Sequence, residues 1–377
     1  MHVSCRTRVL DDDAHAPPAR RGTSLSLSIG PLFALVLSLV GTCAYALPDW
    51  VTSLWSETSD YPIANSGYEG ASSGRSTVAW IDNDRVLFVS TGPLLSSGEP
   101  RRSGTRGLYL WDTRSGNVKR YYEPVQGFCF ADGMLRYWGD EDGSVYEYAG
   151  RIGEERKHIY AEADYPRRNG WHLNPLTCEY YRDEKLPAGE GVFFRPLRAG
   201  DGYLGGGTAT GSNFTIFLPH GSNEYRKLEL PTRSSMVGYS ELQHAYVLRE
   251  APPYLVLDSA VDRRFWLFSV NDVHVQPLVI PAGPWLRGDI SFVFLTPSGV
   301  VFTSHAAGKP DRDGRPTTGA AGVYMLSDRV AKRIMAGYPY SAAITADGCK
   351  VVTSIAPRAM AGQPAAVKFV DVCAKER

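Results

Sequence analysis

Short runs of alternating apolar and polar residues, separated by small turns, recur along most of the chain after residue 77. In GLYLWDTRSGNVKRYYE (107–123), apolar side chains alternate with polar ones on both sides of a turn at 112–116. Alternation with a period of two is typical of a strand with one buried face, and two such runs around a tight turn are typical of a hairpin. The segment therefore predicts two antiparallel strands.

Two hairpin patterns recur in turn along the chain. The first occurs at 78–90, 127–138, 236–248, 292–304 and 342–354, with a weaker copy at 177–194. The second occurs at 107–123, 144–161, 214–231, 264–281 and 322–337. The turns of the first pattern centre near residues 84, 133, 189, 242, 299 and 348, so one unit of four strands repeats about every 53 residues.

A four-stranded sheet cannot bury both of its faces alone, whereas a ring of such sheets can. The fold class that we expect is all-β: a six-bladed β-propeller of four-stranded blades, forming a single domain over residues 47–377. The sixth unit ends after VKFVDVC (367–373) and lacks an outermost strand. We expect part of segment 47–62 to supply this N-terminal strand, complete the last blade and close the ring.

The turns ADG (131–133), TPSG (296–299) and TADG (345–348), each followed by a later Leu/Val-Tyr strand, resemble the repeat of TolB-like propeller proteins. The Ser-Pro-Asp-Gly turn of that repeat is never complete here, and no separate α/β domain precedes the repeats. The resemblance covers the repeats and implies a fold. It implies no activity.

The N-terminal segment has the parts of a secretory signal. Two arginines (20–21) precede an apolar run at 24–43, and AYA (44–46) follows, so we expect cleavage after Ala46 and export to the periplasm or outside the cell. The alternative is that residues 24–46 stay as a membrane anchor, since the run is long enough to span a bilayer. On either interpretation, residues 1–46 are not part of the folded domain.

Four of the six cysteines follow residue 46, and an even number in an exported chain favours two disulfides. Cys349 begins the second strand of the last unit and Cys373 ends the third, so antiparallel pairing brings them together. Cys129 and Cys178 lie on the first strands of adjacent units and form the second expected pair. No CxxC spacing indicates a zinc or thioredoxin-type site.

Composition and motifs exclude several function classes. The formal net charge is zero, with 43% hydrophobic residues, which argues against a general nucleic-acid binder. The G-x-S-x-G, H-E-x-x-H and P-loop patterns are absent, and no histidine after residue 46 has a second histidine at i+2 or i+4. We expect no metal site and no cofactor, and GGGTATG (205–211) is interpreted as a flexible loop.

The long connections between second and third strands are expected at one rim of the ring, at 91–107, 195–213, 305–322 and 355–367. Positive side chains outnumber negative ones on these loops. The positive residues are Arg101, Arg102, Arg106, Arg195, Arg198, Lys309, Arg312, Arg315 and Arg358, against Glu99, Asp201, Asp311 and Asp313. Guanidinium groups on this rim, with His305 beside them, predict a site for an anionic ligand or an acidic partner; solvated loops are the alternative.

Four tryptophans lie near predicted connections, where they either pack or stack on sugar rings: Trp50, Trp55, Trp171 and Trp285. The sequence therefore favours an exported binding module over an enzyme, with an unidentified protein, an anion or a glycan as the partner. The alternative is a carbohydrate-active hydrolase or lyase on the same scaffold. That alternative predicts carboxylates or histidines with shifted pKa values at the mouth of the central channel.

Overall fold

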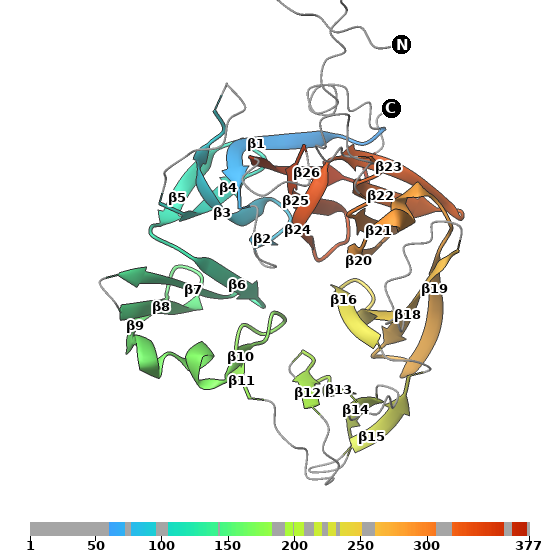
Figure 1. The fold of residues 1–377 in the computed structure, drawn as a ribbon, viewed down its shortest axis with the longest axis horizontal. Helices are drawn as coiled ribbons and strands as arrows, with labels where there is room; N and C mark the ends of the chain where they lie inside the picture. The colour runs from blue at the N-terminus through green and yellow to red at the C-terminus, as the bar shows by residue number, and fades with distance from the viewer. Residues whose placement is uncertain are drawn as a thin grey trace, which may run out of the picture. The chain divides into compact units, whose positions relative to one another are not determined.

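The structure is a computed structural model that describes residues 60–71, 77–95, 105–141, 144–182, 193–198, 200–206, 215–220, 225–230, 234–250, 261–306, 319–357 and 364–374. The chain divides into two units, Met1–Ala46 and Leu47–Arg377, and all described residues belong to the second. Within them, strands predominate (Figure 1), and the only helices are the 3-10 turns η1 (Glu162–Asp164), η2 (Pro166–Asn169) and η3 (Pro284–Arg287). None of the helices in this described part has the length and apolarity that a membrane crossing requires.

Four antiparallel sheets each contain four strands in chain order. The first consists of β6 (Gly127–Ala131), β7 (Met134–Glu141), β8 (Ser144–Arg151) and β9 (Arg156–Ala161). The second consists of β12 (Phe193–Pro196), β13 (Tyr203–Gly206), β14 (Thr215–Pro219) and β15 (Tyr225–Glu229). The third consists of β16 (Ser234–Ser240), β17 (Ala245–Glu250), β18 (Arg263–Ser269) and β19 (His274–Ile280). The fourth consists of β20 (Ile290–Thr296), β21 (Gly299–Ser304), β22 (Gly322–Ser327) and β23 (Val330–Ala336).

The first and last repeats share one larger sheet, in the order β24-β25-β26-β1-β3-β4-β5 with β2 paired to β3. Its C-terminal strands are β24 (Tyr338–Ile344), β25 (Lys350–Ala356) and β26 (Ala365–Asp371). Its N-terminal strands are β1 (Ile63–Gly70), β2 (Val78–Trp80), β3 (Arg85–Pro93), β4 (Gly107–Asp112) and β5 (Val118–Tyr122).

Strand β1 joins the two ends of the repeat array. It pairs antiparallel with β26, from Ile63 opposite Val370 to Gly70 opposite Ala365, and its last residues also pair with β3. An N-terminal segment thus lies beside the last strand of the chain, but this segment is residues 63–70 and not part of 47–62. The expectation that segment 47–62 supplies this strand was wrong in position; IANSGYEG alternates too weakly to be recognised as a strand from its sequence.

The third repeat differs from the predicted one. The sequence placed a hairpin at 177–194 and a long connection at 195–213, whereas β12 and β13 form the first hairpin at 193–206. Gly202 ends its turn at φ +93, where an added Cβ would lie 1.9 Å from the Phe217 carbonyl oxygen. The glycines of YLGG concealed β13, since glycine has low strand propensity, and Gly205–Gly206 belong to this strand and not to a loop. Residues 172–173 and 180–181 form a separate two-stranded sheet, β10 (His172–Leu173) and β11 (Tyr180–Tyr181).

Successive repeats pack against each other through clusters of buried apolar side chains. One cluster joins β16–β19 to β20–β23 around Phe265, Phe302 and Val293, and another joins β24–β26 to β2–β5 around Phe88 and Phe369. Similar clusters lie between β20–β23 and β24–β26, between β2–β5 and β6–β9, and between β12–β15 and β16–β19. The first strands of neighbouring sheets also contact one another, as β16 contacts β20 and β2 contacts both β24 and β6.

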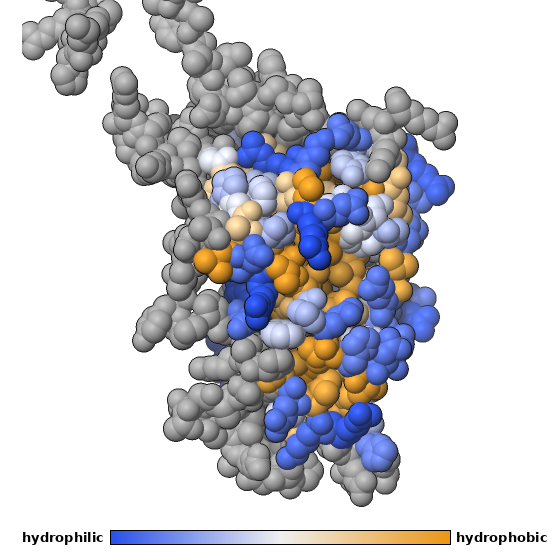
Figure 2. Space-filling view, turned by 90° about the vertical axis from the view of Figure 1, so that its right-hand side faces the viewer, coloured by the Kyte–Doolittle hydropathy of each residue, from blue (hydrophilic) through white to orange (hydrophobic). Residues whose placement is uncertain are grey.

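Outer strands are exposed on one side. Figure 2 shows apolar residues reaching the surface between hydrophilic ones on the side where β19 and β23 lie in Figure 1. Val279 of β19 and Val330 of β23 are among the exposed large apolar side chains. Lys332 and Arg333 also lie exposed on β23, and charges on an outer strand discourage pairing with a second sheet.

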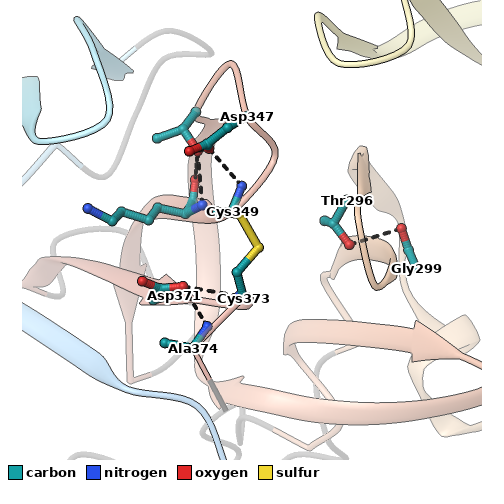
Figure 3. The surroundings of a disulfide bond; sticks show 9 residues. Thr296, Gly299, Asp347, Cys349, Asp371, Cys373 and Ala374 are labelled. Atoms are coloured by element: carbon teal, nitrogen blue, oxygen red, sulfur yellow. Dashed lines mark hydrogen bonds between the residues drawn. A yellow bond between two sulfur atoms is a disulfide. The ribbon is translucent and has the colours of Figure 1, made fainter.

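Both disulfides join the cysteines that strand positions favoured. Cys349 pairs with Cys373, beside the β24–β25 turn, and Cys129 of β6 pairs with Cys178 just before β11. Figure 3 shows how side chains hold the first pair: the Asp347 carboxylate accepts from the Cys349 amide, and the Asp371 carboxylate accepts from the Cys373 amide. The first disulfide links the chain around β25 and β26, and the second links the β6–β9 sheet to the segment before β12.

Candidate functional site

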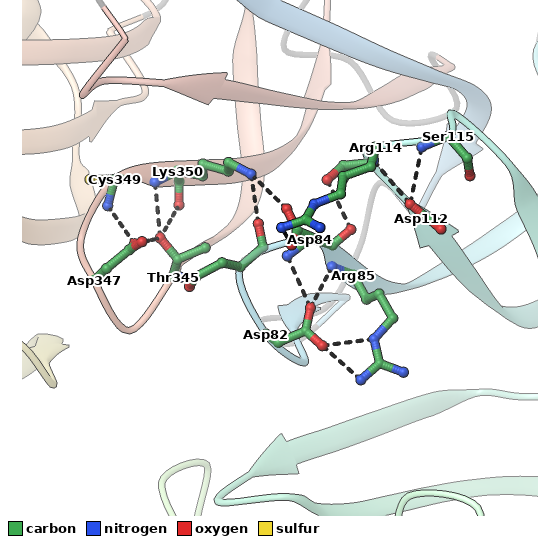
Figure 4. A network of polar contacts seen from close by, with 12 residues as sticks. Asp82, Asp84, Arg85, Asp112, Arg114, Ser115, Thr345, Asp347, Cys349 and Lys350 are labelled. Carbon is green, nitrogen blue, oxygen red and sulfur yellow. Dashed lines mark hydrogen bonds and ion pairs between the residues drawn. The ribbon is translucent and has the colours of Figure 1, made fainter.

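Each sheet has two distinct edges. We define the hairpin edge as the one where the first strand turns into the second and the third into the fourth, and the crossover edge as the opposite one. Ion pairs between turns indicate that the hairpin edges of the first and last repeats lie together. Lys350 Nζ, after the β24–β25 turn, contacts Asp84 Oδ1 of the β2–β3 turn at 3.2 Å, and Arg114 of the β4–β5 turn contacts Asp84 Oδ2 at 2.7 Å (Figure 4).

A pocket of about 280 Å³ opens at the hairpin edge of the β12–β15 sheet. Tyr180, Tyr181 and Tyr203 supply aromatic rings to its wall, and Asn174, Glu179 and Arg198 supply polar groups. The wall thus combines β11, the turn before it and the β12–β13 hairpin. Concave sites that combine aromatic surface with a few convergent polar groups are the usual form of small-molecule sites.

A buried ion pair holds one wall of this pocket. Glu147 of β8 is fully buried, and its carboxylate accepts hydrogen bonds from Arg136 Nη1 at 2.7 Å and from the Tyr180 hydroxyl at 2.7 Å. Arg136 Nε donates to the Cys178 carbonyl oxygen at 2.8 Å, and its guanidinium lies 4.8 Å from the Tyr180 ring centroid. Burial and the hydrogen bonds with Tyr165 and Glu147 raise the pKa of Tyr180 well above its usual range. Tyr180 is therefore a neutral side chain held in one orientation.

Arg198 supplies the only cation to the described wall, and its charge is already countered. Its guanidinium forms ion pairs with Asp132 of the β6–β7 turn and, at 3.6 Å, with Glu241 of the β16–β17 turn. Nη1 donates to the Tyr239 hydroxyl at 3.0 Å, and the guanidinium lies 5.0 Å from the centroid of that ring. Burial opposes the charge, but Tyr239, Glu241 and Tyr246 outweigh it and raise the pKa of Arg198. Arg198 thus connects the turns of three sheets.

A second buried carboxylate stabilises the β12–β13 turn behind Arg198. Asp201 is 7% exposed and accepts from the Tyr246 hydroxyl at 2.6 Å, and His244 Nε2 lies 3.0 Å from the same Oδ2 atom. Tyr246 also accepts from the Arg198 backbone amide at 2.9 Å. Burial, together with the Asp201 carboxylate, raises the pKa of Tyr246 far above its usual range. The turn that carries Arg198 is therefore fixed by the neighbouring sheet.

The crossover edge carries a different polar group, centred on His305. Its ring follows β21 and stacks on Tyr338 of β24 with 4.5 Å between ring centroids. Nε2 contacts the Pro339 carbonyl oxygen, which can only accept, so Nε2 carries the proton. Burial lowers the pKa of His305, partly offset by this hydrogen bond and by Asp289. In the neutral ring Nδ1 is then an acceptor, and the Ser291 hydroxyl donates to it at 3.1 Å.

Only some of the site residues predicted from the sequence lie within the described part of the chain. Arg101, Arg102, Arg312 and Arg315 lie outside the described residues, so an arginine-rich rim stays a prediction. Arg106 is exposed just before β4, and His305 follows β21; both are at crossover edges. Arg198 and Asp201 were expected on the same long-loop rim, and that placement was wrong, because β13 turns their connection into a first-to-second strand hairpin at the opposite edge.

Two of the four tryptophans can be placed. Arg182 lies 4.6 Å from the Trp171 ring, and Trp285 donates from Nε1 to the Pro281 carbonyl oxygen and packs on Tyr324. Trp50 and Trp55 lie outside the described residues. For Trp285 these contacts are packing contacts.

Sequence reasoning missed the residues that build the pocket wall. Glu147 lies on β8 and Arg136 on the neighbouring strand β7. No sequence motif indicates that an acid on one strand pairs with a base on the next. Tyr180 and Glu179 were assigned to a weak repeat copy. The one available signal was a glutamate among the aromatic residues of SVYEYAG. Both faces of a strand inside a packed blade are buried, and a charged residue there needs a buried partner.

Within the described residues, no group of three or more His, Cys, Asp or Glu side chains could hold a metal ion. No protein-family model matches the sequence, and no curated protein is similar to it. Similarity is found among solved structures alone.

Three of the similar solved structures illustrate the range. The mitotic checkpoint complex has a chain that is 12% identical with a TM-score of 0.42, over 83% of this chain and 94% of that one. An acylaminoacyl peptidase from Pyrococcus horikoshii is 11% identical with a TM-score of 0.44, over 77% of this chain and 50% of that one. TolB from Acinetobacter baumannii is 11% identical with a TM-score of 0.35, over 76% of this chain and 63% of that one.

This chain therefore spans half the length of the peptidase and less than two thirds of TolB. TolB is a member of the group that the repeats resemble. With every TM-score quoted below 0.5, these likenesses carry no argument about function.

Proposed function

We propose that the protein is an exported, six-bladed β-propeller that acts as a binding module and takes its ligand in the pocket beside Tyr180 and Arg198. The blades correspond to the six sequence repeats. The pairing of β1 with β26 supports closure, because it joins the N-terminal segment to the sheet of the last repeat. Clusters of apolar side chains between successive sheets support the same arrangement.

Export is supported by the cysteines and by the signal-like segment. Two disulfides within one folded unit are typical of proteins that fold in an oxidising compartment. The arginine pair and apolar run before Ala46 are the parts of a secretory signal. Either the periplasm or the extracellular space fits these features, and retention of residues 24–46 as an anchor is the alternative.

The observation that carries the binding proposal is the rigid support of the pocket. Tyr180 is held by Glu147 and Tyr165, and Arg198 is held by Tyr239 and two carboxylates. Groups fixed before a ligand arrives lose little conformational freedom on binding, and this favours affinity. Burying the charges that provide this support costs free energy, because they are removed from water. A pocket that binds no ligand would have no use for that support.

A ligand screen with a blocked pocket tests this function. Thr177 lines the pocket, so Thr177→Phe should fill it, while Thr177→Val keeps the size of the side chain. Ligands that bind the folded state raise its melting temperature by mass action. We expect at least one compound among neutral sugars, acidic sugars, small anions and small amines to raise the melting temperature of the wild type and of Thr177→Val. The same compound should leave Thr177→Phe unshifted; an equal shift in both variants would place binding elsewhere.

A carbohydrate-active hydrolase or lyase is the second candidate, because His305 has the features of a general base. Its burial lowers its pKa, it lies beside Asp289, and its Nδ1 lone pair faces the Ser291 hydroxyl. A neutral imidazole of this kind is suited to taking a proton from the hydroxyl that donates to it, here that of Ser291. Cleavage of acidic or neutral polysaccharides that disappears in His305→Gln would support this function, and wild-type protein without any cleavage would rule it out.

A further inference from the structure

The charge around the pocket is negative, which limits the ligands that fit. Arg198 is contacted by Asp132 and Glu241, so two carboxylates counter one guanidinium. Asp201 adds a third carboxylate behind the same turn. Glu179 lines the pocket as well, and it is exposed. This excess of negative charge repels an anion that enters the pocket and attracts a cation.

Glu179 is the polar group of the wall that can still accept hydrogen bonds from a ligand. Among the described residues its carboxylate has no hydrogen-bond or ion-pair partner, whereas Asn174 uses both ends of its amide on backbone groups of 176, 196 and 197. The Thr177 hydroxyl, also on the wall, has no partner within the described part either. A carboxylate is negatively charged and accepts hydrogen bonds but donates none, so the complementary ligand group is a cation.

The aromatic lining favours the same ligand chemistry. Tyr180, Tyr181 and Tyr203 line the same pocket as Glu179. Aromatic rings attract ammonium groups through the negative potential of their faces, and attraction is stronger where water is excluded. Rings together with one carboxylate are the combination that recognises alkylammonium groups.

We propose that the pocket binds an organic ammonium group, with Glu179 as its counter-ion and the three tyrosines as its apolar enclosure. This inference rests on the proposed function, since it specifies the ligand class of the same pocket. The ammonium group comes either from a free small amine or from a lysine side chain of a peptide. An alkylammonium head group fits a volume of about 280 Å³ with room for its stem.

The test compares ligands of equal shape and different charge. Choline and its uncharged isostere 3,3-dimethylbutan-1-ol are titrated into the protein, and binding is measured by isothermal titration calorimetry. Nα-acetyl-lysine methylamide, which keeps its ε-ammonium group, represents a lysine side chain of a peptide. We expect choline or the lysine derivative to bind at least about tenfold more tightly than the uncharged alcohol, the difference that one carboxylate at close range supplies. Tighter binding of the lysine derivative would identify a peptide as the source.

Variants separate the ligand class from the site. Glu179→Gln should weaken ammonium binding about tenfold and leave the alcohol unchanged, while Glu154→Gln, which removes an exposed carboxylate from the β8–β9 turn, should change neither. Thr177→Phe should block all three compounds. If a neutral or acidic sugar binds, is blocked by Thr177→Phe and ignores Glu179→Gln, the ammonium inference fails and the binding function stands. If Thr177→Phe affects no compound, both fail.

Discussion

Removal of the Cys349–Cys373 disulfide tests how the last repeat is stabilised. The two cysteines are 24 residues apart in sequence. In the chain-entropy description, a cross-link around a loop of this length restricts the unfolded chain by about 3.5 kcal/mol at 25 °C. We therefore expect the double variant Cys349→Ser/Cys373→Ser to lose about 3.5 kcal/mol of unfolding free energy.

The folded state should change little, because other contacts hold the same residues. The Val372 amide donates to the Cys349 carbonyl oxygen at 2.8 Å, and Asp347 and Asp371 accept from the amides of the two cysteines at 3.0 Å (Figure 3). The loss should then arise in the unfolded state. Near-ultraviolet circular dichroism of the folded variant should match that of the wild type.

The assay is urea unfolding followed by tryptophan fluorescence, with the linear dependence of free energy on urea giving the stability. Cys129→Ser/Cys178→Ser is the matched control: its 49-residue separation predicts a loss of about 4 kcal/mol, slightly above that of the first pair. A Cys349→Ser/Cys373→Ser protein within about 1 kcal/mol of the wild type would refute the reasoning, since no other contact can replace a missing cross-link in the unfolded chain.

Three further predictions concern the pocket wall, the crossover edge and the β12–β13 turn. Glu147→Ala leaves the Arg136 guanidinium without its buried counter-ion, so urea unfolding should report a loss of about 3–5 kcal/mol; a loss below about 1 kcal/mol would mean that water replaces the carboxylate. Burial lowers the pKa of His305, so its unfolded form binds a proton that the folded form resists. The unfolding free energy should therefore fall as the pH drops below about 6.5, and His305→Gln should flatten that dependence; an equal slope in both proteins would contradict it. Gly202→Ala should destabilise the protein by more than Gly200→Ala, because both have positive φ but an added Cβ meets the Phe217 carbonyl at Gly202 and nothing within 4 Å at Gly200; equal melting temperatures would disprove the clash.

Strands were predictable from sequence where alternation and turn residues agreed. The hairpins at 127–138 and 292–304 are β6–β7 and β20–β21, because short apolar runs flank Asp-Gly and Ser-Gly turns there. The Cys349–Cys373 pair followed from strand positions, whereas Cys178 pairs with Cys129 but lies outside the strand on which it was expected. Prediction failed at β1 and at β12–β13, where glycine and polar residues form strands that only pairing with β26 and β14 makes stable.

The candidate site could not be predicted from local patterns. Arg198 meets Asp132 and Glu241 across turns of three sheets, and Glu147 meets Tyr180 across a gap of 33 residues. Such contacts depend on how the sheets pack against each other, which no single segment encodes. The sequence did identify His305 as a residue of interest, because it ends a strand at the crossover edge.

A crystal structure of the protein with bound choline would show where the ligand lies. We expect electron density for the ligand between Tyr180, Tyr181 and Tyr203, with its ammonium group against the Glu179 carboxylate. Density for the ligand at the crossover edge, beside His305 or Arg106, would contradict it, as would a pocket closed by the protein's own side chains.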